Sequence, residues 1–322
     1  MKPLFTHTRP RRQSGFNLIE LMISMLLGLL VVGAAIGIFI SNRKTYSATE
    51  GLSRIQEAAR TGFEMMAQDL REAGGNQCDS GLPVVNVLNN PTQQWFTNWA
   101  LPLSGYENSS PPGLTTTAGT DAIQILSAGT GGATVIQHDP VANTLMLNAA
   151  APDLHAGAIM LLCDRQQLAV LQVATVAGTN VTYATGGLNK CTQLGRLPGA
   201  CAPGVNSYTF EMNSILSELR AVRWYVATAS SKVGTSLYQQ VIGPGGAPVN
   251  NEIAEGVTGL QFMYLLSGAT AYVDANAVAN NWANVVAVRI VMTVNSNDPV
   301  AAGQQPVART FSTTVSIRNR NP

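Results

Sequence analysis

One apolar run dominates the first part of the chain. From Leu21 to Ile40 the only polar side chain is Ser24, and Glu20 stands immediately before this run. An α-helix rises 1.5 Å per residue, so about twenty-five residues counted from Phe16 are enough to span a bilayer. The pattern therefore predicts a transmembrane helix over residues 16–40.

Beyond the apolar run, the pattern changes to a helical repeat without an intervening proline. Apolar residues recur at spacings of three and four, which places them on one helical face. They are Leu52, Ile55, Ala59, Phe63, Met66 and Leu70, and the charged and amide side chains between them, Asp69 included, are assigned to the polar face. Gly74-Gly75 is a usual stop signal. Residues 16–75 are thus predicted to form one long helix whose amphipathic half packs on a globular domain.

Residues 76 to 117 show no hydrophobic period and contain five prolines, together with Trp95, Trp99 and Tyr106. This composition predicts a long structured loop across the surface of the domain. Two interpretations of its aromatic residues are open. They can form a partner site, or the loop can pack over its own aromatic rings, which is the interpretation we favour.

From about residue 118 onward, short apolar runs alternate with Gly, Asn and Asp. Several of these runs have period two with one polar face, which is typical of half-buried antiparallel strands. The predicted strands are Ala122–Ser127, Ala158–Leu162, Leu168–Val176, Leu219–Ala227, Ser236–Val241, Val257–Leu265, Val285–Val294 and Thr310–Ile317. A long helix followed by antiparallel strands predicts an α+β fold, with residues 76–322 as the globular domain.

The first fifteen residues carry Lys2, Arg9, Arg11 and Arg12 and no acid. A basic segment before an apolar one stays in the cytoplasm, so the domain is expected on the exported side. A secretory signal has small residues after its apolar core, whereas here Gly15 precedes the core. Cleavage at Gly15 would remove a leader of residues 1–15 and leave the apolar helix on the mature chain.

Glu20 is the residue in this segment that most needs an explanation. Carrying a carboxylate to the bilayer centre costs about 2.5–3.5 kcal/mol on insertion scales. The apolar segment offers it no partner. We therefore expect the partner to be another molecule, which indicates an assembly.

The segment from Gly15 to Leu21, Gly-Phe-Asn-Leu-Ile-Glu-Leu, resembles the class III signal of type IV prepilins and type II secretion pseudopilins. The resemblance implies that a membrane prepilin peptidase cuts after Gly15 and that Phe16 becomes the methylated first residue. It also implies that Glu20 is the family's fifth-position glutamate, which acts in assembly. Asn17 departs from the commoner Thr.

The remainder of the chain resembles the PilW-type minor pilins. The features that carry this resemblance are Ala73-Gly74-Gly75, Trp224-Tyr225, Ser236-Leu237-Tyr238, Glu255-Gly256-Val257 to Phe262, and the segment Val315 to Arg320 with its Arg-Asn-Arg. Residues 76 to 210 match least. The resemblance implies a type IV pilus subunit that joins other minor pilins and the major pilin, first in the inner membrane with a periplasmic domain and then in the fibre. A type II secretion minor pseudopilin is the alternative.

Cysteine usage fits an exported domain. An even count of four favours two disulfides there. Cys191 and Cys201 close a short loop, and Cys78 with Cys163 then pair by elimination. Zinc is the alternative for these thiols, but the chain has no Cys-x-x-Cys, so no metal or other cofactor is expected.

Charge and motifs argue against other functions. Without the four basic residues of the leader, fifteen Lys and Arg remain against 18 Asp and Glu, so no basic footprint for nucleic acid is expected. Gly129–Gly132 and Gly243–Gly246 lack a Gly-Lys-Ser/Thr continuation and predict turns. His138-Asp139-Pro140 also predicts a turn, since no Gly-x-Ser-x-Gly accompanies it. A signal-anchored periplasmic enzyme or binding protein is therefore a weaker hypothesis than a structural subunit.

Overall fold

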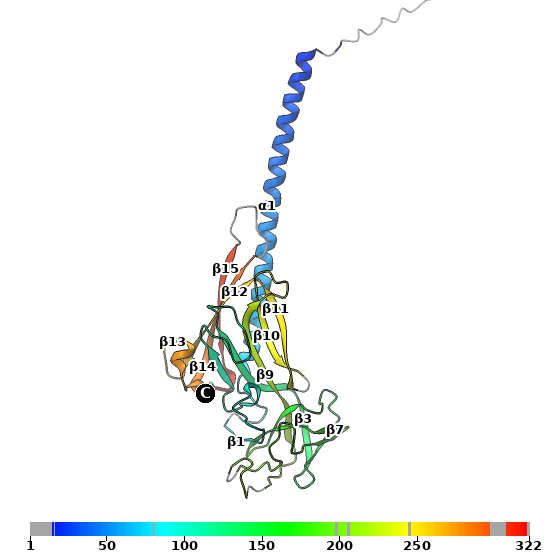
Figure 1. Ribbon diagram of the computed structural model, residues 1–322, viewed down its shortest axis with the longest axis vertical. Helices are drawn as coiled ribbons and strands as arrows, with labels where there is room; N and C mark the ends of the chain where they lie inside the picture. Colours follow the sequence, from blue (N-terminus) through cyan, green and yellow to red (C-terminus); the bar gives the residue numbers. More distant parts are fainter. Residues whose placement is uncertain are drawn as a thin grey trace, which may run out of the picture.

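The computed structural model describes residue 15 and residues 17–79, 81–196, 199–204, 207–243, 246–296 and 307–320. Phe16 and most of the predicted leader therefore lie outside the described residues. The longest element is α1 (Leu18–Arg71), a helix of 54 residues that projects far beyond the strands (Figure 1). Every side chain from Leu18 to Tyr46 is exposed, and burial begins at Gly51. The predicted single helix, exposed first and packed later, is confirmed.

Strands are the main regular elements in the rest of the described chain. Their bounds are β1 (Val84–Asn86), β2 (Leu103–Tyr106), β3 (Ala122–Asp139), β4 (Thr144–Leu147), β5 (Ile159–Cys163), β6 (Leu168–Gln172), β7 (Thr175–Ala177), β8 (Asn180–Thr182), β9 (Ser214–Thr228), β10 (Thr235–Ile242), β11 (Pro248–Glu255), β12 (Val257–Leu266), β13 (Tyr272–Val273), β14 (Val285–Asn295) and β15 (Ala308–Ser316). The short helices are η1 (Trp95–Thr97), α2 (Ala275–Val278), η3 (Trp282–Asn284) and η4 (Arg318–Arg320). The fold is α+β, as predicted.

Two sheets organise these strands. Within the described chain, the large sheet follows the order β1-β6-β5-β9-β3-β4-β8-β7, with β10 and β11 beside β9 and β2 beside β3. The small sheet has the order β13-β12-β14-β15. Its strands pair antiparallel throughout, whereas β1 and β6 of the large sheet are parallel.

The long antiparallel pair β3 and β9 connects two lobes. The start of β3 pairs with β2 and its end with β4, while the start of β9 pairs with β5 and its end with β10. We define the proximal lobe as the packed half of α1, β2, β10 to β15 and the adjoining halves of β3 and β9. The distal lobe comprises β1, β4 to β8 and the other halves of β3 and β9 (Figure 1).

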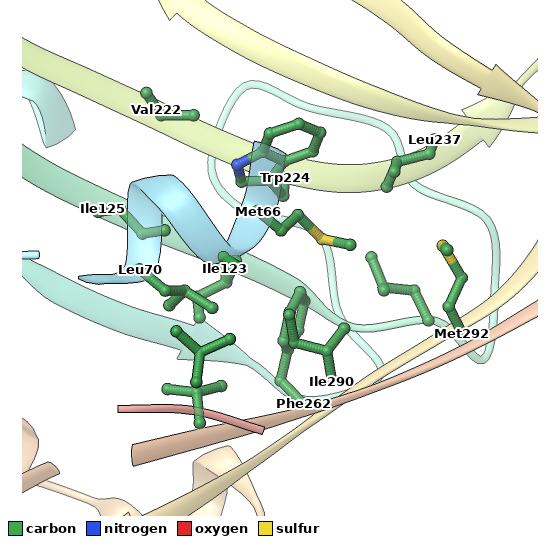
Figure 2. Close-up of a cluster of buried hydrophobic side chains, with 14 of the residues drawn as sticks. Met66, Leu70, Ile123, Ile125, Val222, Trp224, Leu237, Phe262, Ile290 and Met292 are labelled. Atoms are coloured by element: carbon green, nitrogen blue, oxygen red, sulfur yellow. The ribbon is translucent and has the colours of Figure 1, made fainter. Parts of the chain in front are cut away.

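The proximal core forms where α1 inserts between the two sheets. Figure 2 shows Met66 and Leu70 of the helix among side chains from both. The large sheet contributes Ile123, Ile125, Val222, Trp224 and Leu237, and the small sheet contributes Phe262, Ile290 and Met292. Of the face predicted from sequence, Ile55, Ala59, Met66 and Leu70 are buried and Phe63 is partly buried. Leu52 lies outside this cluster and is only partly buried.

The distal core is built without the helix. Its described members come from strands and loops between Val85 and Leu216, and Val135, Leu145, Leu162, Leu171 and Val181 are among them. A third cluster, which includes Trp99, Leu161 and Leu219, contains residues of the segment after the helix and of the large sheet. Neither cluster contains a described residue of α1.

Each of the eight predicted strands coincides with strand structure, although Leu168–Val176 divides into β6 and β7. Residues 76–117 were expected to be a loop throughout, but they contain β1, η1 and β2. The expectation that Gly129–Gly132 forms a turn is wrong. These residues stay in β3, where the ladder with β9 slips between Ala128 and Gly132 to form a bulge.

Candidate assembly site

The start of α1 presents the predicted processing site in an open position. Gly15 is exposed and precedes the helix, and an added Cβ at this residue would meet no atom within 4 Å. Asn17 is the N-cap residue, and its backbone carbonyl accepts from the Glu20 and Leu21 N–H groups at 2.9 and 3.2 Å. The geometry leaves the Gly15 backbone accessible.

The apolar half of α1 is not buried by any described part of the chain. The helix is long and apolar enough to cross a membrane, and its most apolar stretch is entirely unburied. Ser24 donates its hydroxyl to the Glu20 backbone carbonyl at 2.6 Å, whereas no described residue bonds the Glu20 carboxylate. An apolar surface with one unneutralised carboxylate needs lipid around it and a cation or donor from another molecule.

Asp69 seats the other half of α1 on the large sheet. Its carboxylate is 2% exposed. It accepts from Arg220 Nη2 at 2.7 Å, Trp224 Nε1 at 2.8 Å and Gln239 Nε2 at 3.0 Å. Arg220 and Trp224 belong to β9 and Gln239 to β10. Three donors from two strands thus fix one residue of the helix.

Burial raises the pKa of Asp69, while the charge of Arg220 and the two neutral donors oppose this rise. The assignment of Asp69 to the polar face of the helix was wrong. The signal was present in the sequence, because Asp69 lies three residues after Met66 and four before Ala73, both of which are buried. A buried carboxylate at this position requires partners, and only the fold shows which residues they are.

The helix end meets the Arg-Asn-Arg segment, although about 240 residues separate them in the sequence. Gly74 has a φ of +69°. An added Cβ at Gly75 would overlap the Asn319 side chain. Arg320 Nη1 donates to the backbone carbonyls of Trp282 and Val285. Burial lowers the pKa of Arg320. Two motifs that carried the family resemblance therefore contact each other and close the proximal lobe.

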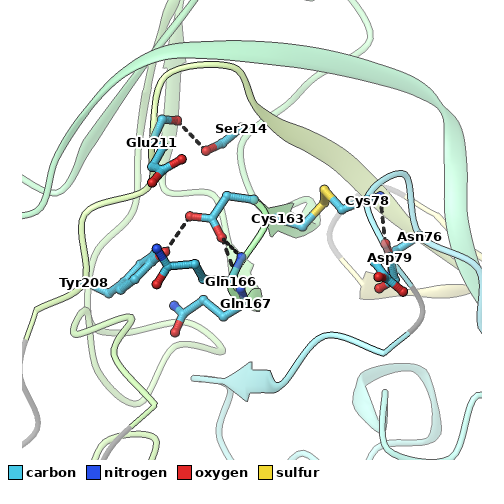
Figure 3. The surroundings of a disulfide bond; sticks show 10 residues. Asn76, Cys78, Asp79, Cys163, Gln166, Gln167, Tyr208, Glu211 and Ser214 are labelled. Carbon is cyan, nitrogen blue, oxygen red and sulfur yellow. Dashed lines mark hydrogen bonds between the residues drawn. A yellow bond between two sulfur atoms is a disulfide. The ribbon is translucent and has the colours of Figure 1, made fainter.

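Two disulfides hold the distal lobe. Cys78 pairs with Cys163 and Cys191 with Cys201, with Cα–Cα distances of 6.2 and 5.5 Å, so the expected pairing agrees with the structure. Figure 3 shows the bond between Cys78 and Cys163. Cys78 follows α1 in the sequence, and Cys163 is the last residue of β5. Beside Cys163, the Asp164 carboxylate accepts from Tyr208 Oη at 2.6 Å and from two backbone N–H groups.

The aromatic residues of the segment after the helix pack inward. Trp99 is 6% exposed, and the guanidinium of buried Arg223 lies 4.1 Å from the Trp95 ring centre. Arg223 also donates to Gln124 Oε1 and to the Pro112 carbonyl. Burial lowers the pKa of Arg223 to about 10. These contacts favour the interpretation that the segment packs over its own aromatic rings.

Of the turn predicted at His138-Asp139-Pro140, only Pro140 lies in a turn, because β3 continues to Asp139. His138 is a buried titratable group. It lies in β3, where its Nδ1 accepts from the Phe210 N–H at 2.9 Å and its Nε2 lies 2.7 Å from Tyr183 Oη. Burial lowers the pKa of His138 to about 4. Its neighbours make it a core residue of the distal lobe. Among the described residues, no group of three His, Cys, Asp or Glu could hold a metal ion.

Comparison with known protein families identifies two matching regions of the chain. A model described as Type IV Pilus-assembly protein W matches residues 223–319, and a model of the prokaryotic N-terminal methylation motif matches residues 10–36. The chain carries the features of a PilW-type, prepilin-like protein. No curated protein and no solved structure matches it.

The two matched regions coincide with particular parts of the fold. The methylation motif covers the start of α1, and the PilW-type match runs from Arg223 in β9 through β10 to β15, which is most of the proximal lobe. The distal lobe lies outside both. The two matches support a type IV pilus-related, pilin-like protein. The methylation motif and the apolar helix indicate a membrane anchor and processing by prepilin peptidase, with pilus components as partners.

Proposed function

We propose that this PilW-type protein is a minor pilin, a structural and non-catalytic subunit that helps initiate type IV pili and is incorporated into them. The observation that carries the proposal is the unpartnered apolar half of α1, with Glu20 at its start, on a helix whose other half is seated in a globular lobe. Such a helix can pass from a bilayer to a bundle of similar helices without refolding the domain.

In this proposal, residues 1–15 are a cytoplasmic leader that prepilin peptidase removes after Gly15. Residues 16–75 form the assembly helix, of which residues 16–40 span the inner membrane, and residues 76–322 form the periplasmic domain. The mature chain starts at methylated Phe16. Its partners are other minor pilins and the major pilin, first in a small priming complex and then in the fibre at the cell surface.

Glu20 has a specific role in this scheme. Its carboxylate neutralises the amine of Phe16, either its own or that of a neighbouring subunit, within an apolar environment where an unpaired charge is costly. Glu20→Ala should therefore be cleaved and inserted in the membrane, yet be reduced at least tenfold in sheared fibres. A Glu57→Ala variant, at an exposed site in the packed half of α1, is the matched control and should be incorporated normally.

Quantitative immunoblots of sheared fibres and membranes measure both variants. Incorporation of Glu20→Ala at the wild-type level would contradict the assembly role of the carboxylate. Gly15→Val tests the processing step separately, because a side chain at the scissile position should leave the precursor about fifteen residues longer. Recovery of wild-type protein with type II secretion pseudopilins, and not with pilus subunits, would favour the pseudopilin alternative.

A further inference from the structure

A cleft of about 680 Å³ lies where the proximal and distal lobes meet. Residues from both lobes line it: the bulge of β3, the loop after β4 from Asn148 to Leu154, Met160 of β5, Leu216 to Ala221 of β9 and the end of β10. Its volume lies within the range of about 300–1,000 Å³ that is typical of ligand sites, which often lie between lobes or domains.

Small residues form two walls of this cleft. Gly129, Gly131, Gly132 and Ala133 line it from β3, and Ala149-Ala150-Ala151 lines it from the loop after β4. An added Cβ at Gly131 would meet no atom within 4 Å. Residues 129–131 also have no register partner in β9, because the ladder jumps from Ala128 to Gly132. A main chain can therefore approach Gly131 closely, whereas the Gln77 side chain already fills the space beside Gly132.

The charge of the cleft is negative. Arg220 lines it, but its guanidinium is paired with buried Asp69 at 2.7 Å. Glu218 and Asp153 also line it, and neither carboxylate forms an ion pair with a described residue. None of the described lining residues is aromatic, so a nucleobase or another flat ring would find no stacking partner.

We propose that this cleft binds an extended peptide segment with a lysine or arginine side chain. The small-residue walls accommodate its main chain, and Glu218 and Asp153 pair with its cation. Most of the lining lies outside both family matches, and only Gln239, Val241 and Ile242 of β10 fall within the PilW-type match. The proposal is independent of the minor-pilin role, which does not require a ligand here.

A peptide bound in the cleft would also stabilise the seating of α1. Arg220 and Gln239 line the cleft and at the same time donate to Asp69 of α1. A peptide that packs against these two side chains would hold them in the orientation that seats the helix. Binding is therefore expected to stabilise the proximal lobe as well as the distal one.

The test uses the full chain in detergent micelles and three fluorescein-labelled pentapeptides. The peptides are Ala-Ala-Lys-Ala-Ala and the same sequence with norleucine or glutamate at the centre, and fluorescence anisotropy at low ionic strength measures their binding. The lysine peptide should bind at least tenfold more tightly than the norleucine peptide, and the glutamate peptide more weakly than both. Equal binding of all three, or no binding, would overturn the proposal.

Three variants locate the binding. Glu218→Gln should remove most of the tenfold advantage of the lysine peptide, whereas Gly131→Val should fill the cleft and abolish binding of every peptide. Gly81→Val, at an exposed glycine outside the cleft, is the matched control and should bind normally. All three should melt like the wild type. Unchanged binding by Gly131→Val would overturn the assignment to this cleft, whereas cleavage after Gly15 tests the pilin role independently.

Discussion

The proximal and distal lobes share two long strands but are stabilised in different ways. The proximal lobe buries α1 between two sheets, and its described residues contain neither disulfide. The distal lobe has a smaller core without α1, and both disulfides lie in it or join it to the end of the helix. The PilW-type match covers most of the first lobe and omits the second.

The proximal lobe shows what the packing of α1 requires, and the distal lobe shows what the rest of the chain adds. A lobe that seats a long helix must match the apolar face of that helix, which constrains many side chains at once. The distal lobe is free of that requirement, and its four cysteines compensate for a core that receives no helix. The same kind of truncation or substitution should therefore change the stability of the two lobes differently.

Loss of the helix should have the largest effect, and it should fall on the proximal lobe. A chain that begins at Asn76 lacks Ile55, Met66 and Leu70, each worth about 1.5–3 kcal/mol of burial. Together they represent much of the usual 5–15 kcal/mol of a domain. A chain that begins at Tyr46 keeps all three and should melt cooperatively. Equal melting temperatures for the two chains would show that the helix does not stabilise this lobe.

Loss of the Cys78–Cys163 disulfide should mainly affect the distal lobe. It closes a loop of 85 residues, and the chain-entropy estimate for such a loop is about 4–5 kcal/mol. Removal of Cys191–Cys201, with a separation of 10, should cost about 3 kcal/mol. Hydrogen exchange of the double-serine variants should show faster opening of β5 and β6 than of β12 and β14. Uniform opening of both lobes would argue against separate stabilisation.

The buried carboxylate of the helix gives the next largest expected effect. Asp69→Ala leaves Arg220 without its partner and two buried donors unsatisfied, which should cost about 3 kcal/mol. Asp69→Asn should cost less because the amide oxygen still accepts hydrogen bonds. Arg60 and Glu64 form an exposed pair on the same helix, and Glu64→Ala should cost under about 1 kcal/mol. Similar losses in chemical denaturation for Asp69→Ala and Glu64→Ala would refute the seating role.

Acid should weaken the distal lobe through His138. Its pKa is about 4 in the folded state, below the ordinary 6.5, because burial disfavours the cation. The unfolded chain therefore binds a proton first as the pH falls below about 6.5, and stability declines until about pH 4. The expected loss is about 2 kcal/mol at pH 5 relative to pH 7.5.

A substitution that removes the titrating group should remove this pH dependence. His138→Gln should lower stability at neutral pH but flatten the profile between pH 7.5 and 5. The partly exposed His155 provides the control, and His155→Gln should retain the wild-type slope. Persistence of that slope in His138→Gln would assign the acid sensitivity to other groups.

The sequence predicted the features that depend on local periodicity. The helix, its stop at Gly74-Gly75 and the alternating strands such as β14 follow from spacings of three and four or of two. The disulfide pairing followed from the short spacing of Cys191 and Cys201. The helix and strand signals lie within a few residues of the element that they describe.

Contacts between distant segments could not be predicted in the same way. The placement of Asp69 under Arg220, Trp224 and Gln239 involves separations of more than 150 residues. The glycine-rich segment of β3 has the composition of a turn, and only its pairing with β9 makes it a bulge. The inter-lobe cleft depends on that pairing, so no local pattern indicates it.

The N-terminus of the chain in assembled fibres tests the central claim most directly. Mass spectrometry of protein from sheared pili should find an N-terminal peptide that begins at methylated Phe16, with residues 1–15 absent. That result would link processing, the apolar half of α1 and incorporation in one sample. Absence of the chain from fibres, or recovery of a peptide that still contains Gly15, would contradict the account.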